Sequence, residues 1–99
     1  MKVVLSDEAR DDLERIGDYI AQDSPSRARS FIRELIAAAR EIGDIPNGFP
    51  LVPRYERLGI RRRPHGAYLI FYRAEAGRVT ILHVLHDARD YEALLFPDA

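Results

Sequence analysis

The sequence predicts an α+β fold of order β-α-α-β-β-β, in which a helical hairpin packs on a four-stranded, mainly antiparallel sheet. Two runs rich in β-branched and aromatic residues, 68–72 and 79–85, flank the polar connector 74–78. This pattern is typical of a β-hairpin with a short glycine-containing loop. The first half of the chain instead carries two stretches with apolar residues at helical spacing. A short apolar run at residues 3–5 is long enough for one strand but not for a helix.

The first predicted helix begins after Ser6, a suitable N-cap residue, and has Asp7 and Glu8 in its first turn. One face carries apolar residues at spacings of four, three and four, namely Ala9, Leu13, Ile16 and Ile20. The other faces carry charged residues that we expect to be exposed, namely Asp11, Asp12, Glu14, Arg15 and Asp18. The helix is therefore predicted to bury a single face.

The second predicted helix begins with Ser24 as N-cap and Pro25 at the first helical position, where a missing N–H loses no hydrogen bond. Its apolar face is broader and consists of Ala28, Phe31, Ile32, Leu35, Ile36, Ala39 and Ile42, and Gly43 suits the C-terminal cap. Since the connection is short, the two helices should pair as an antiparallel hairpin. The broad face either fills the core, which we favour, or leaves a groove for a partner helix.

The segment 44–53 contains three prolines and an Asn-Gly pair, which indicate an ordered loop that crosses the domain. We expect residues 59–63 to form a strand that pairs with residues 68–72. The last three strands then form an antiparallel meander, and the N-terminal strand must join it because a lone strand is not stable. Residues 91–95 are predicted to add a turn of helix.

The two faces of the predicted sheet should differ. The helical hairpin covers one face, whereas the other, with Arg61, Arg63 and Arg73, is expected to stay partly open for a partner.

The composition fits one domain over residues 1–99, with no cysteine for a disulfide, a thiolate metal site or a nucleophile. The net charge is −1, which argues against a dedicated nucleic-acid binder. Fourteen of the fifteen basic residues are arginine, so the positive groups can form bidentate contacts to carboxylate or phosphate. The N-terminus is too short in apolar residues for a signal peptide, and no stretch approaches a membrane span, so we expect a cytoplasmic protein.

The two histidines near the end of the last strand are candidate metal ligands or acid-base groups. Alternation along the strand places His83 and His86 on opposite sides of the sheet, so they should not chelate one ion. His83 lies among aliphatic residues and is interpreted as a hydrogen-bonded structural residue. His86, at the strand end, is the better functional candidate.

An arginine cluster is the other feature that could take part in binding or catalysis. Arg61, Arg62 and Arg63, with Arg73 and Arg89, could hold phosphates or stabilise a phosphodiester transition state, helped by Tyr68, Tyr72 or Tyr91. The alternatives are a solvated face or a docking surface for an acidic peptide. No Ser-His-acid arrangement, phosphate loop or paired-carboxylate motif is visible. We therefore predict no catalytic residue, metal ligand or cofactor.

Three stretches together resemble the ParE branch of the RelE/ParE toxin superfamily, in addition to the order of elements and the Arg61-Arg62 strand. They are IPNG at 45–48, YLIFYR at 68–73 and, most specifically, ILHVLHDARD at 81–90. The resemblance implies a toxin of a type II toxin-antitoxin module that a small ParD-type antitoxin neutralises in a hetero-oligomer. It also implies growth inhibition by poisoning of DNA gyrase.

The RelE branch instead cuts mRNA on the ribosome, and this activity is the alternative. Here Arg61 and Arg89 match basic positions, but Tyr68 or Leu69 stands where a RelE-type arginine is expected on the central strand. The tail beyond Tyr91 has no late tyrosine or basic residue. These departures favour a toxin that binds its target without chemistry of its own. From the net charge and the lack of a long apolar stretch, we expect no direct nucleic-acid binding and no membrane binding. A third possibility is a member that has lost toxicity and only binds an antitoxin.

The residues expected to contact a partner or target are Arg61, Arg63, Arg73, His86, Arg89, Phe31 and Leu35.

Overall fold

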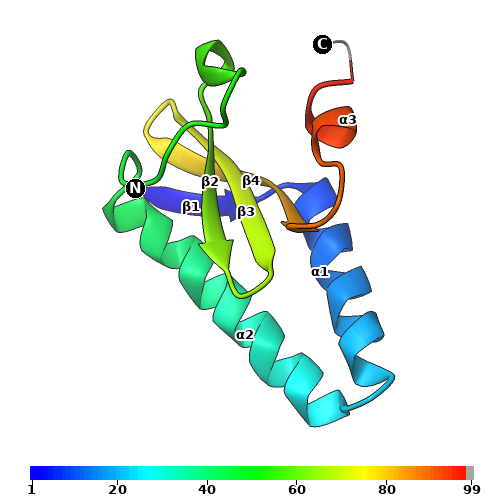
Figure 1. The fold of residues 1–99 in the computed structure, drawn as a ribbon. Helices are drawn as coiled ribbons and strands as arrows, with labels where there is room; N and C mark the ends of the chain where they lie inside the picture. The colour runs from blue at the N-terminus through cyan, green and yellow to red at the C-terminus, as the bar shows by residue number, and fades with distance from the viewer. Residues whose placement is uncertain (98–99) are drawn as a thin grey trace.

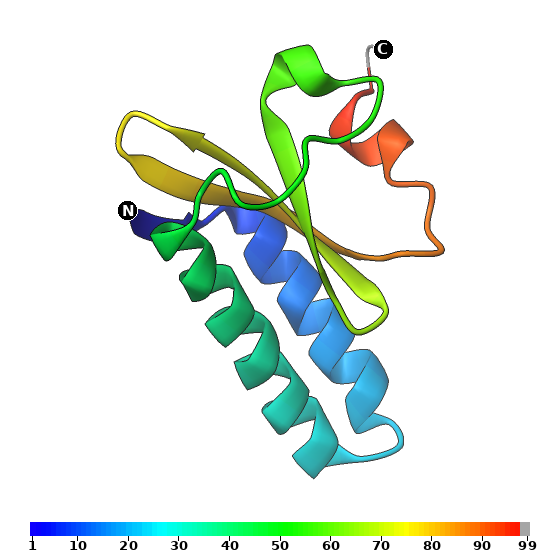
Figure 2. The ribbon, with the colours of Figure 1, turned by 60° about the vertical axis from the view of Figure 1, so that its left-hand side comes forward.

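The computed structural model describes residues 1–97, which form β1 (Lys2–Leu5), α1 (Asp7–Ala21), α2 (Pro25–Glu41), β2 (Ile60–His65), β3 (Tyr68–Glu75), β4 (Arg78–His86) and α3 (Glu92–Leu95). Two single-turn 3-10 helices, η1 (Ile42–Asp44) and η2 (Glu56–Leu58), lie between α2 and β2. The predicted order of elements is confirmed, including the C-terminal helical turn. Figures 1 and 2 show α1 and α2 on one side of the sheet and α3 on the other. None of the helices within residues 1–97 is long and apolar enough to cross a bilayer.

The strand order in the sheet is β1-β4-β3-β2. The strands β2, β3 and β4 form the predicted antiparallel meander. The N-terminal strand joins it in parallel to β4, with Val3 opposite Val79 and Leu5 opposite Ile81. The four-stranded, mainly antiparallel sheet predicted from the sequence is therefore confirmed.

The turn between β3 and β4 consists of only Ala76 and Gly77, because both strands extend further than their apolar runs. Both residues have left-handed backbone conformations, with φ of 54° at Ala76 and 76° at Gly77. Two consecutive left-handed residues are typical of a type I′ turn, whose twist matches that of the strands. Glycine adopts this conformation freely, whereas alanine is strained in it.

Replacing Ala76 with asparagine is expected to raise the free energy of unfolding by about 1 kcal/mol, since asparagine tolerates the left-handed region better than alanine. Urea denaturation of the two proteins measures the difference. The matched variant Gly77→Ala should shift the midpoint in the opposite direction. An Ala76→Asn variant less stable than the parent would contradict the assigned turn.

The two predicted N-caps are confirmed. The Ser24 hydroxyl accepts a hydrogen bond from the backbone N–H of Arg27 at 3.2 Å. The Ser6 hydroxyl accepts one from the N–H of Ala9 at 3.0 Å and donates one to the carbonyl of Leu82, also at 3.0 Å. Ser6 therefore caps α1 and also fastens the start of this helix to β4.

The predicted capping role of Gly43 is wrong. The helix α2 ends at Glu41, and Gly43 lies in the following 3-10 turn without a left-handed conformation. A Cβ at this position would lie 2.4 Å from the carbonyl oxygen of Met1, while the N-terminal ammonium donates to the Gly43 carbonyl at 2.7 Å. Glycine is needed here because the chain start approaches closely.

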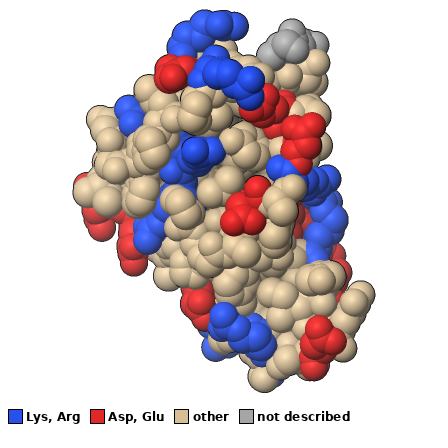
Figure 3. Space-filling view, in the orientation of Figure 1, with Lys and Arg blue, Asp and Glu red and all other residues tan. Residues whose placement is uncertain are grey.

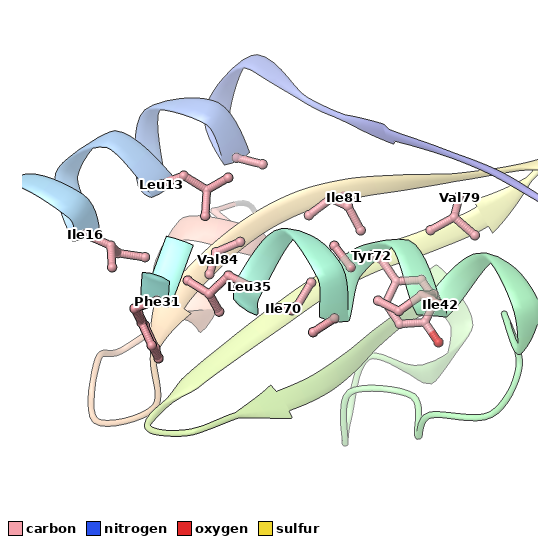
Figure 4. Packing of buried hydrophobic residues seen from close by; sticks show 13 residues of the cluster. Leu13, Ile16, Phe31, Leu35, Ile42, Ile70, Tyr72, Val79, Ile81 and Val84 are labelled. Carbon is pink, nitrogen blue, oxygen red and sulfur yellow. The ribbon is translucent and has the colours of Figure 1, made fainter. Parts of the chain in front are cut away.

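The main core lies between the helical hairpin and the sheet. Figure 4 shows side chains of α1 and α2, among them Leu13 and Leu35, directed toward Ile70, Ile81 and Val84 of the sheet. The broad apolar face of α2 mostly fills this core, as favoured from the sequence.

A second cluster covers the opposite sheet face, which the sequence predicts to be partly open. Its buried members come from the sheet, the preceding loop and the C-terminus: Val52, Ile60, Leu69, Phe71, Leu85 and Phe96. The rings of Tyr55 and Phe96 stack on each other at 3.7 Å between centroids. The loop before β2 and the segment around α3 therefore cover part of this face.

Candidate interaction surface

Arg61 and Arg63 lie on the sheet face toward α2, not on the opposite face as predicted. The guanidinium of Arg63 donates to the carbonyl of Ala38 at 2.7 Å and to the carboxylate of Glu41 at 2.9 Å. That of Arg61 donates to the carbonyl of Phe49 at 2.7 Å. The register explains the correction, because Ile60 occupies the opposite face together with the second core. Both arginines are thus engaged within the fold.

Arg73 lies on the face expected for it, since it pairs in register with Ile60. Its Nε is 3.4 Å from a carboxylate oxygen of Glu75. Arg73 therefore lies on the opposite face of the sheet from Arg61 and Arg63.

Phe31 and Leu35 of α2 differ in whether a partner could reach them. Leu35 is only 1% exposed and belongs to the main core, so it offers no surface to a partner. Phe31 is 8% exposed, but its ring lines a hollow next to the helix ends. Only Phe31 of these two therefore remains a candidate contact residue.

His86 borders this hollow, which measures about 580 Å³ and lies between the adjoining ends of α1 and α2 and the β2–β3 turn. Side chains that line it are Tyr19, Ile20, Arg27, Phe31, Tyr68 and His86. A neighbouring depression is also lined by Tyr68 and His86 and includes Arg89. We call the hollow together with Arg89 the His86 surface. Three predicted contact residues, Phe31, His86 and Arg89, thus come together here.

Aromatic contacts fix the shape of the His86 surface. The ring of Tyr68 lies 5.2 Å from that of His86 in an edge-to-face arrangement and 5.5 Å from that of Phe31. The guanidinium of Arg27 lies 5.1 Å above the Phe31 ring. Tyr19 is 69% exposed at the rim. An apolar floor with a cationic rim is suited to a protein partner.

Glu34 of α2 holds Arg27, a residue at the rim of the His86 surface, in place. Its carboxylate accepts hydrogen bonds from Arg27 at 2.6 Å and lies 3.3 Å from Nε2 of His65. These two contacts, the Arg27 contact first, lower the pKa of Glu34. Arg27 is therefore held by an ionised partner in its position above Phe31.

His86 is oriented by the backbone that follows it. The N–H of Ala88 donates to Nδ1 of His86 at 3.1 Å, and the N–H of Arg89 donates to the carbonyl of His86 at 3.0 Å. The contact from Ala88 suits the tautomer of His86 that carries its proton on Nε2. The same turn directs the exposed Arg89, which has no ion-pair partner within residues 1–97.

His83 belongs to a hydrogen-bonded network with Asp12, as its interpretation as a structural residue predicted. Its Nδ1 is 2.8 Å from the carboxylate of Asp12, which also accepts a hydrogen bond from the N–H of Val84 at 2.9 Å. Arg15 donates to the other oxygen of the same carboxylate. Asp12 is only 2% exposed, so its prediction as an exposed residue is wrong.

The three tyrosines predicted as possible helpers in catalysis differ in burial and in hydrogen bonding. The hydroxyl of Tyr72 is buried and donates to the carbonyl of Pro46 at 2.8 Å. The hydroxyl of Tyr91 accepts a hydrogen bond from Arg62 at 2.7 Å. Burial raises the pKa of both Tyr68 and Tyr72. Of these three residues, Tyr68 lies on the His86 surface.

Alkaline pH is expected to destabilise the fold through Tyr72. Because its pKa is raised above that of an unfolded chain, its contribution is complete below about pH 10 and is lost as the pH rises through the folded-state value. Urea midpoints at pH 9 and pH 11 measure this loss. It should be smaller in the Tyr72→Phe variant, and equal losses in both proteins would contradict the assignment.

Basic and acidic groups are interspersed on the face of the molecule drawn in Figure 3. Figure 3 shows basic groups in separate patches over β2, over the loop before it and beside the connection to α3, with acidic groups between them. On this face, the arrangement differs from the continuous basic surface typical of nucleic-acid binders. Among residues 1–97, no cluster of three or more side chains suited to binding a metal ion is present.

A family model described as "ParE toxin of type II toxin-antitoxin system, parDE" matches residues 3–91. The chain belongs to the ParE toxin family. The resemblance predicted from the sequence is thereby confirmed.

The fold of this ParE-family chain also matches a solved structure described as "Chromosomal ParDE TA system from P. aeruginosa". The TM-score is 0.74 at 18% sequence identity, and the match covers 87% of this chain and 95% of the other. At this identity the likeness supports the fold alone. A search of curated proteins finds no significant match.

Sequence reasoning missed several members of the His86 surface in this ParE-family chain. Tyr19 and Arg27 lie at the ends of the two helices, and no local pattern indicates that the sheet turn reaches them. The available signal was the short Gln22-Asp23-Ser24 connection, which brings both helix ends together. The position of Tyr68 on the His86 surface is also hard to predict from the sequence, because it depends on where β3 begins.

Proposed function

We propose that this ParE-family chain arrests bacterial growth by binding and poisoning DNA gyrase, and that a ParD-type antitoxin neutralises it. The observation that supports binding best is the His86 surface, which joins an apolar floor to the exposed Arg89. Interfaces between proteins commonly combine aromatic anchors with arginine in this way. Gyrase as the target is inferred from the family resemblance.

The state of the β2 arginines argues against the ribonuclease alternative. Arg61, Arg62 and Arg63 each donate to a group of the chain itself, so part of their hydrogen-bonding capacity is used within the fold. Tyr72 is likewise buried and bonded. A binding inhibitor needs a complementary surface, whereas a ribonuclease must also place an acid and a base around the scissile phosphate.

One observation favours a ribonuclease. Tyr68, His86 and Arg89 lie together, and side chains of these types can transfer protons and stabilise negative charge. Alanine at Arg89 or at Arg61 should abolish mRNA cleavage by a ribonuclease while antitoxin affinity is kept.

The experiment that separates these functions is pulse-labelling of bacteria shortly after induction of this chain alone. Thymidine and methionine incorporation are followed separately. Gyrase poisoning predicts an early fall in DNA synthesis with induction of the DNA-damage response. An early loss of protein synthesis with mRNA cut at codon boundaries would contradict the proposal and support the ribonuclease.

A further inference from the structure

A pocket of about 450 Å³ lies between the sheet, the start of α1, η2 and α3. Its volume is within the range of about 300–1,000 Å³ that is usual for small-molecule sites. Much of its lining is aliphatic and comes from segments that are far apart in sequence, namely Leu58, Ile60, Leu82, Leu94 and Leu95. It shares no lining residue with the His86 surface. The proposed function therefore makes no use of it.

Arg73 brings a buried donor without an acceptor to this pocket. Its Nε–H is buried and makes no hydrogen bond within residues 1–97. A carboxylate oxygen of Glu75 lies 3.4 Å from this Nε, but not in the direction of the N–H. Buried donors in proteins are normally paired with the chain, with water or with a ligand, because an unpaired one is destabilising. The side chain as a whole is 40% exposed, so a ligand can reach it from solvent.

Two further polar side chains restrict the kind of ligand. Nδ1 of His83 is 2.8 Å from the buried carboxylate of Asp12, which holds the ring and leaves Nε2 available to a ligand. The only carboxylate in the lining belongs to Glu8, an exposed residue of the first turn of α1. A polyanion would meet one arginine and a repelling carboxylate. A ligand with a single negative charge suits this set of groups better.

We propose that this pocket binds a small monocarboxylic acid with an aliphatic tail. The carboxylate accepts a hydrogen bond from Nε of Arg73, and a guanidinium is well matched to a carboxylate. When the ring of His83 is protonated, its Nε2 can donate to the same carboxylate. The tail is removed from water among the leucines and Ile60. The site is distinct from the surface proposed to contact the toxin's target.

NMR titration of the isotope-labelled chain with octanoate tests the site. The expected result is saturable binding of one molecule, with shifts of the amide signals of Arg73, Leu82 and Leu95. Two further probes separate the contacts of the head from those of the tail. Octanol has a tail of the same length without the charge, and acetate has the charge without the tail. Each should bind at least about tenfold more weakly than octanoate, since it lacks one set of contacts.

Substitution of Arg73 tests the carboxylate contact itself. Arg73→Gln should weaken octanoate binding at least about tenfold and leave octanol binding unchanged. The control Arg78→Gln makes the same change of charge at an exposed residue outside the pocket and should bind octanoate as the parent does.

A second variant covers the case in which Arg73→Gln does not fold. Leu94 lines the pocket but is 41% exposed, so Leu94→Asp should be tolerated by the fold. The new carboxylate should weaken the binding of octanoate by repulsion and should affect octanol less.

Three outcomes would overturn the inference. Without saturable shifts at millimolar octanoate, solvent alone would pair with the Nε–H of Arg73. Shifts confined to the His86 surface would place the binding elsewhere. Equal affinities for octanoate and octanol, or for octanoate in the parent and in Arg73→Gln, would indicate an apolar cavity without a carboxylate site. The proposed function would be unaffected in each case, because its tests use other residues.

Discussion

Replacing Asp12 with alanine is expected to lower the free energy of unfolding by about 3 kcal/mol, which is a large share of the stability of a small domain. The substitution leaves the buried N–H of Val84 and the ring of His83 without their acceptor. It also removes the hydrogen bonds by which Asp12 links α1 to β4 across 71 and 72 residues of sequence. Chemical denaturation monitored by circular dichroism measures the loss.

Two control variants separate the buried contacts of Asp12 from its exposed ion pair. Arg15→Ala removes only the contact with an arginine that is 64% exposed, so its effect should stay below about 1 kcal/mol. Asp12→Asn keeps an oxygen for Val84 and should fall between the other two variants. A loss for Asp12→Ala no larger than that for Arg15→Ala would show that the buried network contributes little.

Replacing Arg89 with glutamate is expected to weaken target binding by about thirtyfold or more, as the loss of a central interface arginine commonly costs about 2 kcal/mol. Arg89 is exposed and directed by the turn after His86, so the change should leave the fold intact. The measurement is the level of expression needed to arrest growth, with melting temperature as the check on folding.

A matched control for Arg89 is Arg57→Glu, which makes the same charge change on the exposed 3-10 turn before β2, away from the His86 surface. It should leave toxicity unchanged. His86→Ala should act in the same direction as Arg89→Glu, since both residues belong to one surface. Equal toxicity of the parent and Arg89→Glu would remove the His86 surface from the account.

Local patterns predicted most of the fold for physical reasons. The last strands are recognised from their alternation and β-branched residues, and the helix starts from the caps Ser6 and Ser24. Both signals depend only on residues that are close in sequence. The burial of Asp12 depends instead on β4, which is distant in sequence. In the sequence, a buried charged residue on a helix looks the same as an exposed one, because the donors that it binds come from a distant strand. No spacing rule within α1 could have indicated this.

The site was predicted less completely because alternation shows which residues share a face but not which face the helices cover. Arg61 and Arg63 were placed opposite the helices, whereas Ile60 and Phe71 bury that face under the loop and the α3 segment. The sheet face of these two arginines was therefore predicted wrongly. His86 and Arg89 were found because the end of a strand places side chains at the surface whichever face is covered.

The most direct test of the proposed function is a supercoiling assay with purified DNA gyrase and the purified chain. The account predicts that supercoiling falls as the chain is titrated in, that cleaved DNA accumulates, and that a ParD-type antitoxin restores activity. Arg89→Glu should require a higher concentration than the parent, and Arg57→Glu should not. Undiminished supercoiling at saturating concentrations, together with mRNA cleavage in a ribosome-containing reaction, would contradict the account.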